Sequence, residues 1–159
     1  MQYRIGLGYD IHRLTKKRKL FLGGIEIACE KGLLGHSDGD VVLHAICDAL
    51  LGAIGERDLG ELFPDRDPKY KGISSSLILK EVFDLVKEKD YEINNIDIVI
   101  VAKFPHLEPF KTKISENISK MLKISRDSVN VKAKTNQEIG ETGKGKAISS
   151  FAVCLLKKR

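Results

Sequence analysis

The sequence predicts an α+β fold, a single domain in which a mixed β-sheet carries helices packed on one face. Three observations lead to this class. The chain has 159 residues, of which 42% are hydrophobic and 31% charged, as in an ordinary globular domain. Strand-like and helix-like hydrophobic patterns are mixed along its length. It contains no repeat, low-complexity tract or Pro/Gly/Ser-rich linker, so residues 1–159 are interpreted as one domain.

In the N-terminal half, residues 3–9 alternate as a strand. Residues 20–27 indicate two short strand pieces around a Gly-Gly pair. The apolar stripe of residues 40–54 predicts a helix, for which Ser37 would be the cap and Asp40 the completing acid of a capping box. On one side of the first strand lie Tyr3, Ile5, Leu7 and Tyr9.

In the C-terminal half, a serine cluster precedes a second amphipathic helix, predicted over about residues 75–89. A third helix follows Pro105 or Pro109, because Phe110, Ile114, Ile118, Met121 and Leu122 fall at helical spacing. Further strands are predicted over residues 96–102, 129–135 and about 147–156. A glycine-rich loop separates the last two strands.

The charge balance is mildly basic, with 27 Lys and Arg against 22 Asp and Glu, a net +5. Much of the excess lies in residues 16–19 and 157–159, which we interpret as solvated surface. The chain lacks a basic stripe with stacking aromatic residues, so nucleic acid is not the expected partner; a small anionic substrate fits the charge better. No apolar run reaches the ~20 residues of a membrane span, so no membrane association is expected.

The cysteines argue for a reducing compartment. Cys29, Cys47 and Cys154 are odd in number and far apart, which disfavours a disulfide framework. The N-terminal residues show no signal-peptide pattern. We therefore expect a cytoplasmic protein.

Three residues form a candidate metal site. Asp10 and His12 stand two residues apart at the end of the first predicted strand, so their side chains share a face. Alone, such a pair is more often a surface hydrogen bond. With His44, from the first turns of the first helix, it makes the N/N/O set that suits Zn²⁺ with one coordination position left open. Asp48, or a backbone carbonyl, would orient His44.

Two further segments are rich in polar groups. Residues 58–67 alternate carboxylates with turn-forming residues, and an apolar Leu-Phe-Pro stretch would anchor them; the alternative is an ordinary polar loop. Residues 132–136 lead from a strand into the glycine-rich stretch 140–145, where amides, a hydroxyl and lysines would cradle phosphate. The spacing is not that of a P-loop, and taken alone the motif is weak.

Taken together, these segments occur in an order that resembles one family. The motifs are Gly8-Tyr9-Asp10-Ile11-His12, Gly35-His36-Ser37-Asp38-Gly39-Asp40 followed by His44, Asp58-Leu59-Gly60 through Phe63-Pro64-Asp65, Val129 to Thr135, and Thr142-Gly143-Lys144-Gly145. They resemble the 2-C-methyl-D-erythritol 2,4-cyclodiphosphate synthases of non-mevalonate isoprenoid biosynthesis. The resemblance spans roughly residues 3–156.

The resemblance implies a reaction and a set of site residues. In that family the 2-phosphate of a cytidine diphosphate ester of methylerythritol attacks the β-phosphorus, and CMP leaves. Zn²⁺ would sit on Asp10, His12 and His44, while His36 and Thr135 would position and stabilise the transferred phosphoryl group. Ser37 would contact the substrate beside His36. The implied substrate contacts are Asp10, Ile11, His12, His36, Ser37, Asp58, Leu59, Gly60, Phe63, Pro64, Asp65, Arg66, Asp67, Ala102, Lys103, Phe104, Pro105, His106, Leu107, Glu108, Lys134, Thr135, Asn136, Gln137, Glu141 and Lys144.

The chain departs from the family pattern at three positions. Gln137 replaces a glutamate that usually binds a second divalent cation, Mg²⁺ or Mn²⁺, although Glu138 is adjacent. Glu141 replaces a common aromatic residue, and Lys144 replaces an arginine. The first change concerns the second metal. The other two concern the central cavity near the threefold axis of the assembly, where the family's aromatic and arginine residues can hold an isoprenoid diphosphate. None of them concerns the zinc ligands.

The family forms homotrimers with sheets facing the threefold axis, so a homotrimer is expected here. Two alternatives carry different consequences. A zinc-dependent phosphohydrolase would use a metal-bound water and release linear phosphates. A non-catalytic trimeric binding module would use the nucleotide pocket only for recognition.

Overall fold

The sheet is mixed and carries its helices on one face. The computed structural model describes residues 2–64, 66–70 and 72–159. Five strands follow the order β4-β1-β7-β5-β6, and all neighbours are antiparallel except the parallel pair β5 and β6. The strands are β1 (Tyr3–Lys16), β4 (Lys31–Leu33), β5 (Tyr91–Val101), β6 (Val129–Lys134) and β7 (Ala147–Lys158). The α+β class is therefore confirmed.

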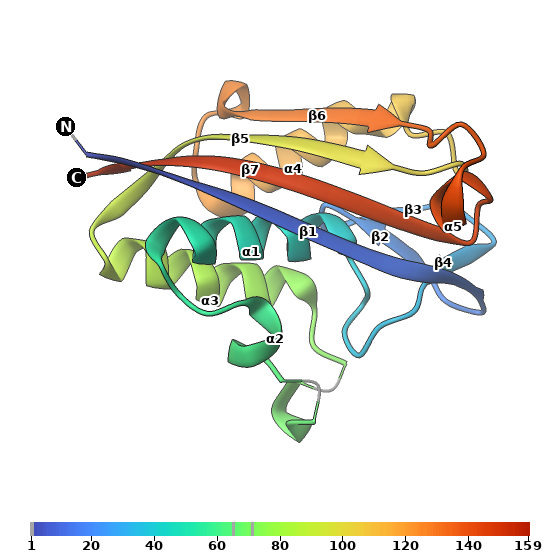
Figure 1. The fold of residues 1–159 in the computed structure, drawn as a ribbon, viewed down its shortest axis with the longest axis horizontal. Helices are drawn as coiled ribbons and strands as arrows, with labels where there is room; N and C mark the ends of the chain where they lie inside the picture. Colours follow the sequence, from blue (N-terminus) through green and yellow to red (C-terminus); the bar gives the residue numbers. More distant parts are fainter. Residues whose placement is uncertain (1, 65, 71) are drawn as a thin grey trace.

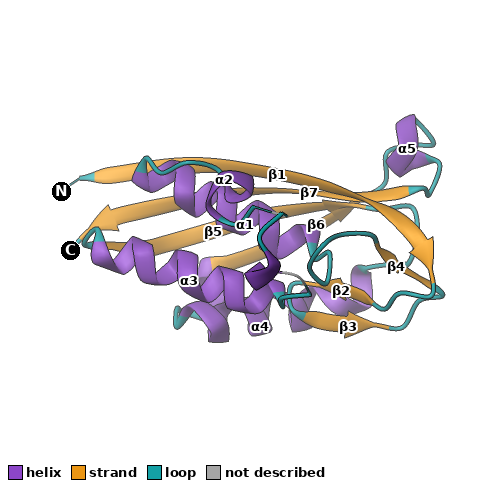
Figure 2. Ribbon diagram, turned by 90° about the horizontal axis from the view of Figure 1, so that it is seen from below, coloured by secondary structure: helices purple, strands orange, loops and turns teal. Residues whose placement is uncertain are grey.

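Three long helices cover one face of the sheet, as the two views of Figures 1 and 2 agree. They are α1 (Val41–Ile54), α3 (Ser75–Glu88) and α4 (Lys111–Leu122). A separate hairpin pairs β2 (Leu20–Leu22) with β3 (Ile25–Ile27). Short helical turns make up the rest: α2 (Leu59–Leu62), α5 (Gly140–Gly143), and the 3₁₀ turns η1 (Pro68–Tyr70), η2 (Glu108–Phe110) and η3 (Arg126–Ser128).

Helix α1 lies directly on β1 because two glycines leave room for it. A Cβ atom on Gly8 would stand 1.9 Å from the Ala45 carbonyl oxygen, and one on Gly6 would stand 1.8 Å from that of Ala49. Side chains alternate across a strand, so the residues two and four positions further along β1 also point to the helix side. The register thereby aims Asp10 and His12 at α1.

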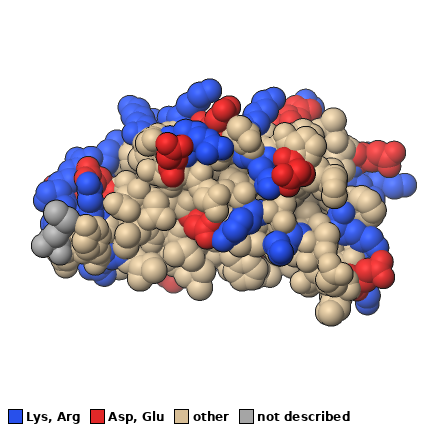
Figure 3. All heavy atoms as spheres, turned by 90° about the horizontal axis from the view of Figure 1, so that it is seen from above, with Lys and Arg blue, Asp and Glu red and all other residues tan. Residues whose placement is uncertain are grey.

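The other face of β1 is apolar and exposed. Ile5 is 71% exposed and Leu7 67%, values unusual for large aliphatic side chains. The apolar residues of this face are Tyr3, Ile5, Leu7, Tyr9 and Ile11 of β1 with Phe151 and Val153 of β7. Figure 3 views the molecule from the side opposite the helices and shows a broad uncharged area there. We call these seven residues the open sheet face.

The start of α1 corrects the capping prediction. Asp40, not Ser37, is the N-cap: its carboxylate accepts hydrogen bonds from the amides of Val42 and Leu43. The same fully buried carboxylate accepts the amides of Gly23 and Gly24 in the β2–β3 turn. Asp40 accepts hydrogen bonds from four backbone amides, two in the helix and two in the hairpin. The Ser37 hydroxyl of the predicted capping box would satisfy fewer donors, so Asp40 is favoured as the N-cap.

Several element boundaries also differ from the prediction. β1 continues to Lys16, beyond Tyr9, because its backbone pairs with β7 as far as Arg13 and Ala147, and then with β4. β5 begins at Tyr91 rather than at residue 96, and a register irregularity between Ile93 and Asn95 interrupts its pairing with β7. The glycine-rich loop contains the helical turn α5.

The basic cluster at residues 16–19 is only partly solvated surface. Arg18 is half-buried and donates to two backbone carbonyls of the loop before α1, so the prediction was wrong for this residue. Cys29, Cys47 and Cys154 are free thiols. Within the described residues, none of the helices has the length and apolarity that crossing a membrane would require.

Candidate active site

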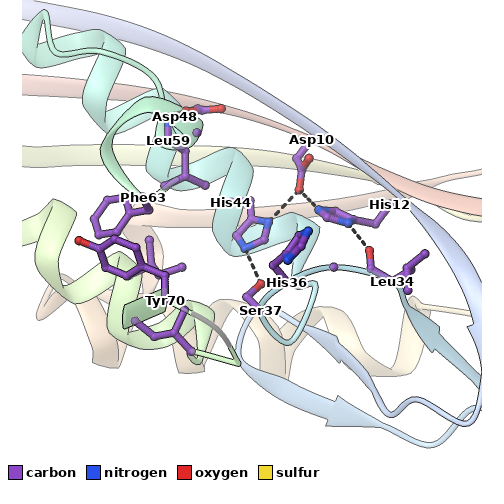
Figure 4. A pocket seen from close by; sticks show the side chains of 14 residues that line it. Asp10, His12, Leu34, His36, Ser37, His44, Asp48, Leu59, Phe63 and Tyr70 are labelled. Carbon is purple, nitrogen blue, oxygen red and sulfur yellow. Dashed lines mark hydrogen bonds and ion pairs between the residues drawn. The ribbon is translucent and has the colours of Figure 1, made fainter. Parts of the chain in front are cut away.

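Asp10, His12 and His44 converge where β1 crosses the start of α1. The Asp10 Oδ2 atom lies 2.9 Å from His12 Nε2 and 2.9 Å from His44 Nδ1. One ligand atom from each residue lies within 4.8 Å of the others. The structure therefore brings together the three residues that the sequence proposed as a metal site. Figure 4 shows the two imidazoles reaching the carboxylate from different elements.

The outer nitrogens of both imidazoles are held by other groups. His12 Nδ1 is hydrogen-bonded to the Leu34 carbonyl oxygen, which leaves Nε2 for Asp10 or a metal. His44 Nε2 lies 3.2 Å from Ser37 Oγ and 2.9 Å from Ser75 Oγ. These contacts set the ring orientations, as partners of metal-bound histidines usually do. Ser75, at the start of α3, carried no functional signal in the sequence.

Asp48 does not orient His44, contrary to the expectation from its helical spacing. Its carboxylate instead accepts the Leu59 amide at 2.8 Å and so fixes α2 against α1. Burial, with repulsion from Asp58 and Asp10, raises the pKa of Asp48 above its ordinary value. The Asp48 carboxylate therefore lies on the α2 side of the cavity.

The chemistry of the three donors fits a divalent cation of the first transition row. Burial disfavours ionisation of Asp10, but the hydrogen bonds and charges of His12 and His44 outweigh it and lower its pKa to about 2. The carboxylate is thus an anion at neutral pH. One carboxylate and two imidazoles, with their outer nitrogens occupied, suit a metal that accepts mixed N and O ligands.

A cavity of about 480 Å³ opens beside the three ligands. Its walls are Asp10, His12, Leu34, Gly35, His36, Ser37, His44, Asp48, Leu59, Gly60, Phe63, Tyr70, Ile73 and Ile78. In Figure 4, Asp10 and the histidines gather with Ser37 at one side, and Leu59, Phe63 and Tyr70 lie at the other, with Asp48 beside Leu59. Phe63 and Tyr70 contact edge to face, with ring centroids 5.2 Å apart. One wall of the cavity therefore carries polar side chains suited to binding a metal ion, and another wall is apolar.

A second, smaller cavity of about 190 Å³ lies at the ends of β5 and β6. It is lined by Ala102, Pro105, His106, Leu107, Glu108, Ala133, Lys134 and Thr135. It shares no lining residue with the first cavity. Next to it, Gln137 Nε2 donates to Thr135 Oγ1 at 2.9 Å, and Glu138 pairs with Lys103 at 3.1 Å.

The remaining predicted site residues lie outside these two cavities. Ile11 belongs to the open sheet face, and Asp58 is the N-cap of α2. Pro64 and Arg66 line a neighbouring surface hollow with Gly60. Glu141 pairs with Lys146 at 3.5 Å. Neither cavity is lined by Asp67, Lys103, Phe104, Asn136, Gln137 or Lys144, and Asp65 is outside the described residues.

An α+β domain whose cavity is lined by two histidines and an aspartate is consistent with the class of metal-dependent enzymes. Over residues 3–157 the sequence matches the YgbB family. The chain belongs to this family.

Named relatives sharpen this assignment. The 2-C-methyl-D-erythritol 2,4-cyclodiphosphate synthase of Clostridium acetobutylicum is 53% identical over 153 residues, which cover 96% of this chain and 99% of the relative. That of Caldicellulosiruptor bescii is 50% identical over 154 residues, covering 97% and 98%.

Solved structures agree on the fold. A CDP complex of IspF from Plasmodium falciparum has a TM-score of 0.87 at 38% identity and covers 99% of this chain and 97% of its own. The bifunctional IspDF from Campylobacter jejuni has a TM-score of 0.95 at 39% identity; this chain spans 43% of that longer protein.

Proposed function

We propose that this chain converts 4-diphosphocytidyl-2-C-methyl-D-erythritol 2-phosphate to 2-C-methyl-D-erythritol 2,4-cyclodiphosphate and CMP, as a phosphorus–oxygen lyase. The observation that carries the proposal is that the Asp10, His12 and His44 ligands share one cavity with His36 and Ser37. Relatives at about half identity over nearly the full chain bear the name of this enzyme.

In this proposal Asp10, His12 and His44 hold Zn²⁺. When bound, the metal supplies a Lewis acid at an oxygen of the β-phosphate. A new bond forms between a 2-phosphate oxygen and the β-phosphorus, and the bond to the oxygen bridging to the α-phosphorus breaks. The electron pair leaves with CMP. The attacking phosphate is already ionised at neutral pH, so no side chain is needed as a base.

The chain's own residues act by positioning and charge stabilisation, which dominate phosphoryl transfer. His36 and Ser37 line the wall beside the triad, where the transferred group would sit. The apolar wall of Leu59, Phe63 and Tyr70 suits the methylerythritol carbon skeleton. In the second cavity, the Thr135 hydroxyl accepts from Gln137 and so keeps its own proton for a phosphate oxygen.

The second cavity is the proposed cytidine site. The strand-end segment around Pro105 to Glu108, with Lys134, offers backbone groups and one cation to a nucleotide. One structural neighbour is a CDP complex, which supports a nucleotide ligand for this fold. Because the metal cavity and this cavity share no residue within a chain, we infer that a neighbouring copy completes each site.

A homotrimer is the proposed assembly. The open sheet face leaves seven large apolar side chains in solvent, among them a Tyr9–Phe151 ring pair with centroids 4.7 Å apart. Exposed patches of this kind mark interfaces. Three copies facing a common axis would bury all three faces. We also place the protein in the cytoplasm, which suits its free thiols.

A second divalent cation, Mg²⁺ or Mn²⁺, is proposed to arrive with the substrate. Glu138 is poorly suited as its ligand, because its carboxylate pairs with Lys103. Gln137 donates through Nε2 to Thr135, which leaves its amide oxygen available. Substrate phosphates and water would then supply most of the coordination, as is usual for Mg²⁺.

The deciding experiment is ³¹P NMR of the protein with the cytidine diphosphate substrate, Zn²⁺ and Mg²⁺. We expect signals of the cyclic diphosphate and of CMP in equal amounts. Linear phosphate products would instead identify a hydrolase. Binding of the substrate without turnover would identify a non-catalytic module.

A further inference from the structure

Arg18 is hydrogen-bonded twice to the loop that carries His36. Its Nη1 donates to the Gly35 carbonyl at 3.0 Å, and its Nη2 donates to the Ser37 carbonyl at 2.7 Å. The two acceptors are the carbonyls of the residues before and after His36, which belong to the Gly35–His36 and Ser37–Asp38 peptide groups. A planar guanidinium with fixed N–H directions can hold two such acceptors at once.

The four carbonyls from Leu34 to Ser37 all have hydrogen-bond partners. The Leu34 carbonyl is bonded to His12, and the His36 carbonyl accepts the Gly72 amide at 2.9 Å. The two carbonyls that remain between Leu34 and Ser37 are those held by Arg18. Peptide orientation determines where the side chains between two held peptide groups point, so Arg18, together with the Gly72 amide, constrains the direction of the His36 side chain.

The backbone of Arg18 packs closely against strand β4. A Cβ on Gly32 of β4 would stand 2.6 Å from the Arg18 carbonyl oxygen, so the two backbones are in close contact. On the loop's far side, a Cβ on Gly35 would stand 3.2 Å from His12 Cε1. The loop therefore lies between Arg18 and the His12 ring. In packing this close, a displacement of a few tenths of an ångström would move side chains that line the cavity.

We propose that Arg18 is a positioning residue for His36 in the cyclisation reaction. The inference rests on the proposed function. Arg18 touches neither the metal ligands' donor atoms nor the cavity, whose walls it does not line. Its effect is exerted through the Gly35–His36 peptide group and through the Ser37 carbonyl, one residue beyond His36. It would thus act on the rate of the chemical step more than on substrate affinity.

The principal competing role is electrostatic attraction of the polyanionic substrate by the basic segment 16–19. Substitutions that change the charge and the hydrogen-bond geometry separately can distinguish electrostatic attraction from positioning. Arg18→Lys keeps the charge but replaces the fork by one compact ammonium group. Lys16→Ala removes a charge from the same segment at an exposed side chain and leaves the fork intact, so it is the matched control.

The kinetic test measures kcat and KM for the three variants. For Arg18→Ala we expect kcat to fall roughly 10- to 100-fold, with KM changing less than about threefold. Arg18→Lys should recover only part of kcat, and Lys16→Ala should match the wild type. A rise in KM that vanishes at high salt, shared by Lys16→Ala, would overturn the proposal, as would an unchanged kcat.

A second readout does not depend on turnover. The chain has four histidines, so imidazole ¹H–¹⁵N spectra can resolve His36. In Arg18→Ala and Arg18→Lys we expect altered His36 signals, unchanged His106 signals and full zinc content. Unaltered His36 signals refute the positioning role even if the protein proves to catalyse another reaction. If Arg18→Ala does not fold, Arg18→Lys decides by the same two measurements.

Discussion

Gly8 of β1 and Ala45 of α1 are in direct backbone contact: a Cβ on Gly8 would stand 1.9 Å from the Ala45 carbonyl oxygen. Ala45 follows His44, and Gly8 precedes Asp10 by two residues on the same face of β1. The close approach of the two backbones therefore determines the distance from His44 on α1 to Asp10 and His12 on β1.

Replacing Gly8 with alanine should push α1 away from β1. We expect the free energy of unfolding to fall by about 3 kcal/mol, the upper range for overpacking, and metal affinity to weaken with it. Chemical denaturation and metal titration measure both. The control is Gly52→Ala on the exposed side of α1, where a Cβ meets nothing within 4 Å; it should stabilise by roughly 0.5–1 kcal/mol. Equal stability of the two variants would contradict the contact argument.

His44→Ala should remove most of the bound zinc and nearly all turnover while the fold is kept. The reason is that two remaining ligands hold a metal far less tightly than three. Metal analysis of the purified variant tests this. His106→Ala, which alters a histidine of the second cavity, should keep a full metal content. Full zinc occupancy in His44→Ala would mean that the ligand assignment is wrong.

The open sheet face should hold the assembly together. Leu7→Glu places a charge on a residue that is 67% exposed in the single chain, and we expect it to dissociate the trimer. Sedimentation should give about three times 17.7 kDa for the wild type and a lower mass for the variant. Leu77→Glu, at an exposed leucine of α3, should leave the mass unchanged. A fully active wild-type monomer would disprove the shared site.

The negative charge of Asp48 should lower the free energy of unfolding at neutral pH. Its pKa is raised in the folded state, chiefly by burial, so the folded protein binds the proton more tightly than the unfolded chain. The resulting stabilisation is present below the ordinary pKa of 3.8 and is lost as pH rises through the folded value. Asp48→Asn keeps an acceptor for the Leu59 amide and should be at least as stable as wild type at pH 7.

The comparison variant is Asp48→Ala, which leaves the Leu59 amide without its acceptor. It should lose about 1 kcal/mol at pH 7. Urea denaturation at pH 4 and pH 7 measures all three proteins. If the wild type gained stability over Asp48→Asn between pH 4 and pH 7, the sign of the pKa shift would be wrong.

Isoprenoid diphosphates should bind weakly or not at all on the proposed threefold axis. Glu141, which pairs with Lys146 at 3.5 Å, brings negative charge in place of an aromatic ring, and Lys144 stands in place of an arginine. Lysine lacks the bidentate fork of arginine. Calorimetry with farnesyl diphosphate tests this. Tight binding that is lost in Lys144→Ala would show that the cavity is still functional.

The three candidate metal ligands were predictable because their chemistry is local. Asp10 and His12 share a face through strand alternation alone, and His44 lies at the start of a strongly patterned helix. The contacts that Ser75 and Asp48 make were not predictable in the same way. Ser75 reaches His44 from a helix 31 residues away, and Asp48 bonds Leu59 rather than its helical neighbour.

Arg18 shows where composition misleads. A run of four basic residues is usually solvated, and three of these four are exposed. What distinguishes Arg18 is the proximity of Gly32 and the loop carbonyls, which depends on how β4 pairs with β1. The exposed apolar side of β1 is a related case, because alternation predicted which residues share a face but not which face the helices cover.

The pairing of Tyr3 with Lys157 brings the two ends of the chain onto neighbouring strands, side by side in Figure 1. Asp10 lies seven residues along β1, about 23 Å from that pair at the rise of an extended strand. A short peptide could therefore join the ends into a circular permutant, with new termini opened in a surface turn. A reporter or a second enzyme fused at either end would hang clear of the metal ligands, so the domain is suited to tethering in modular assemblies.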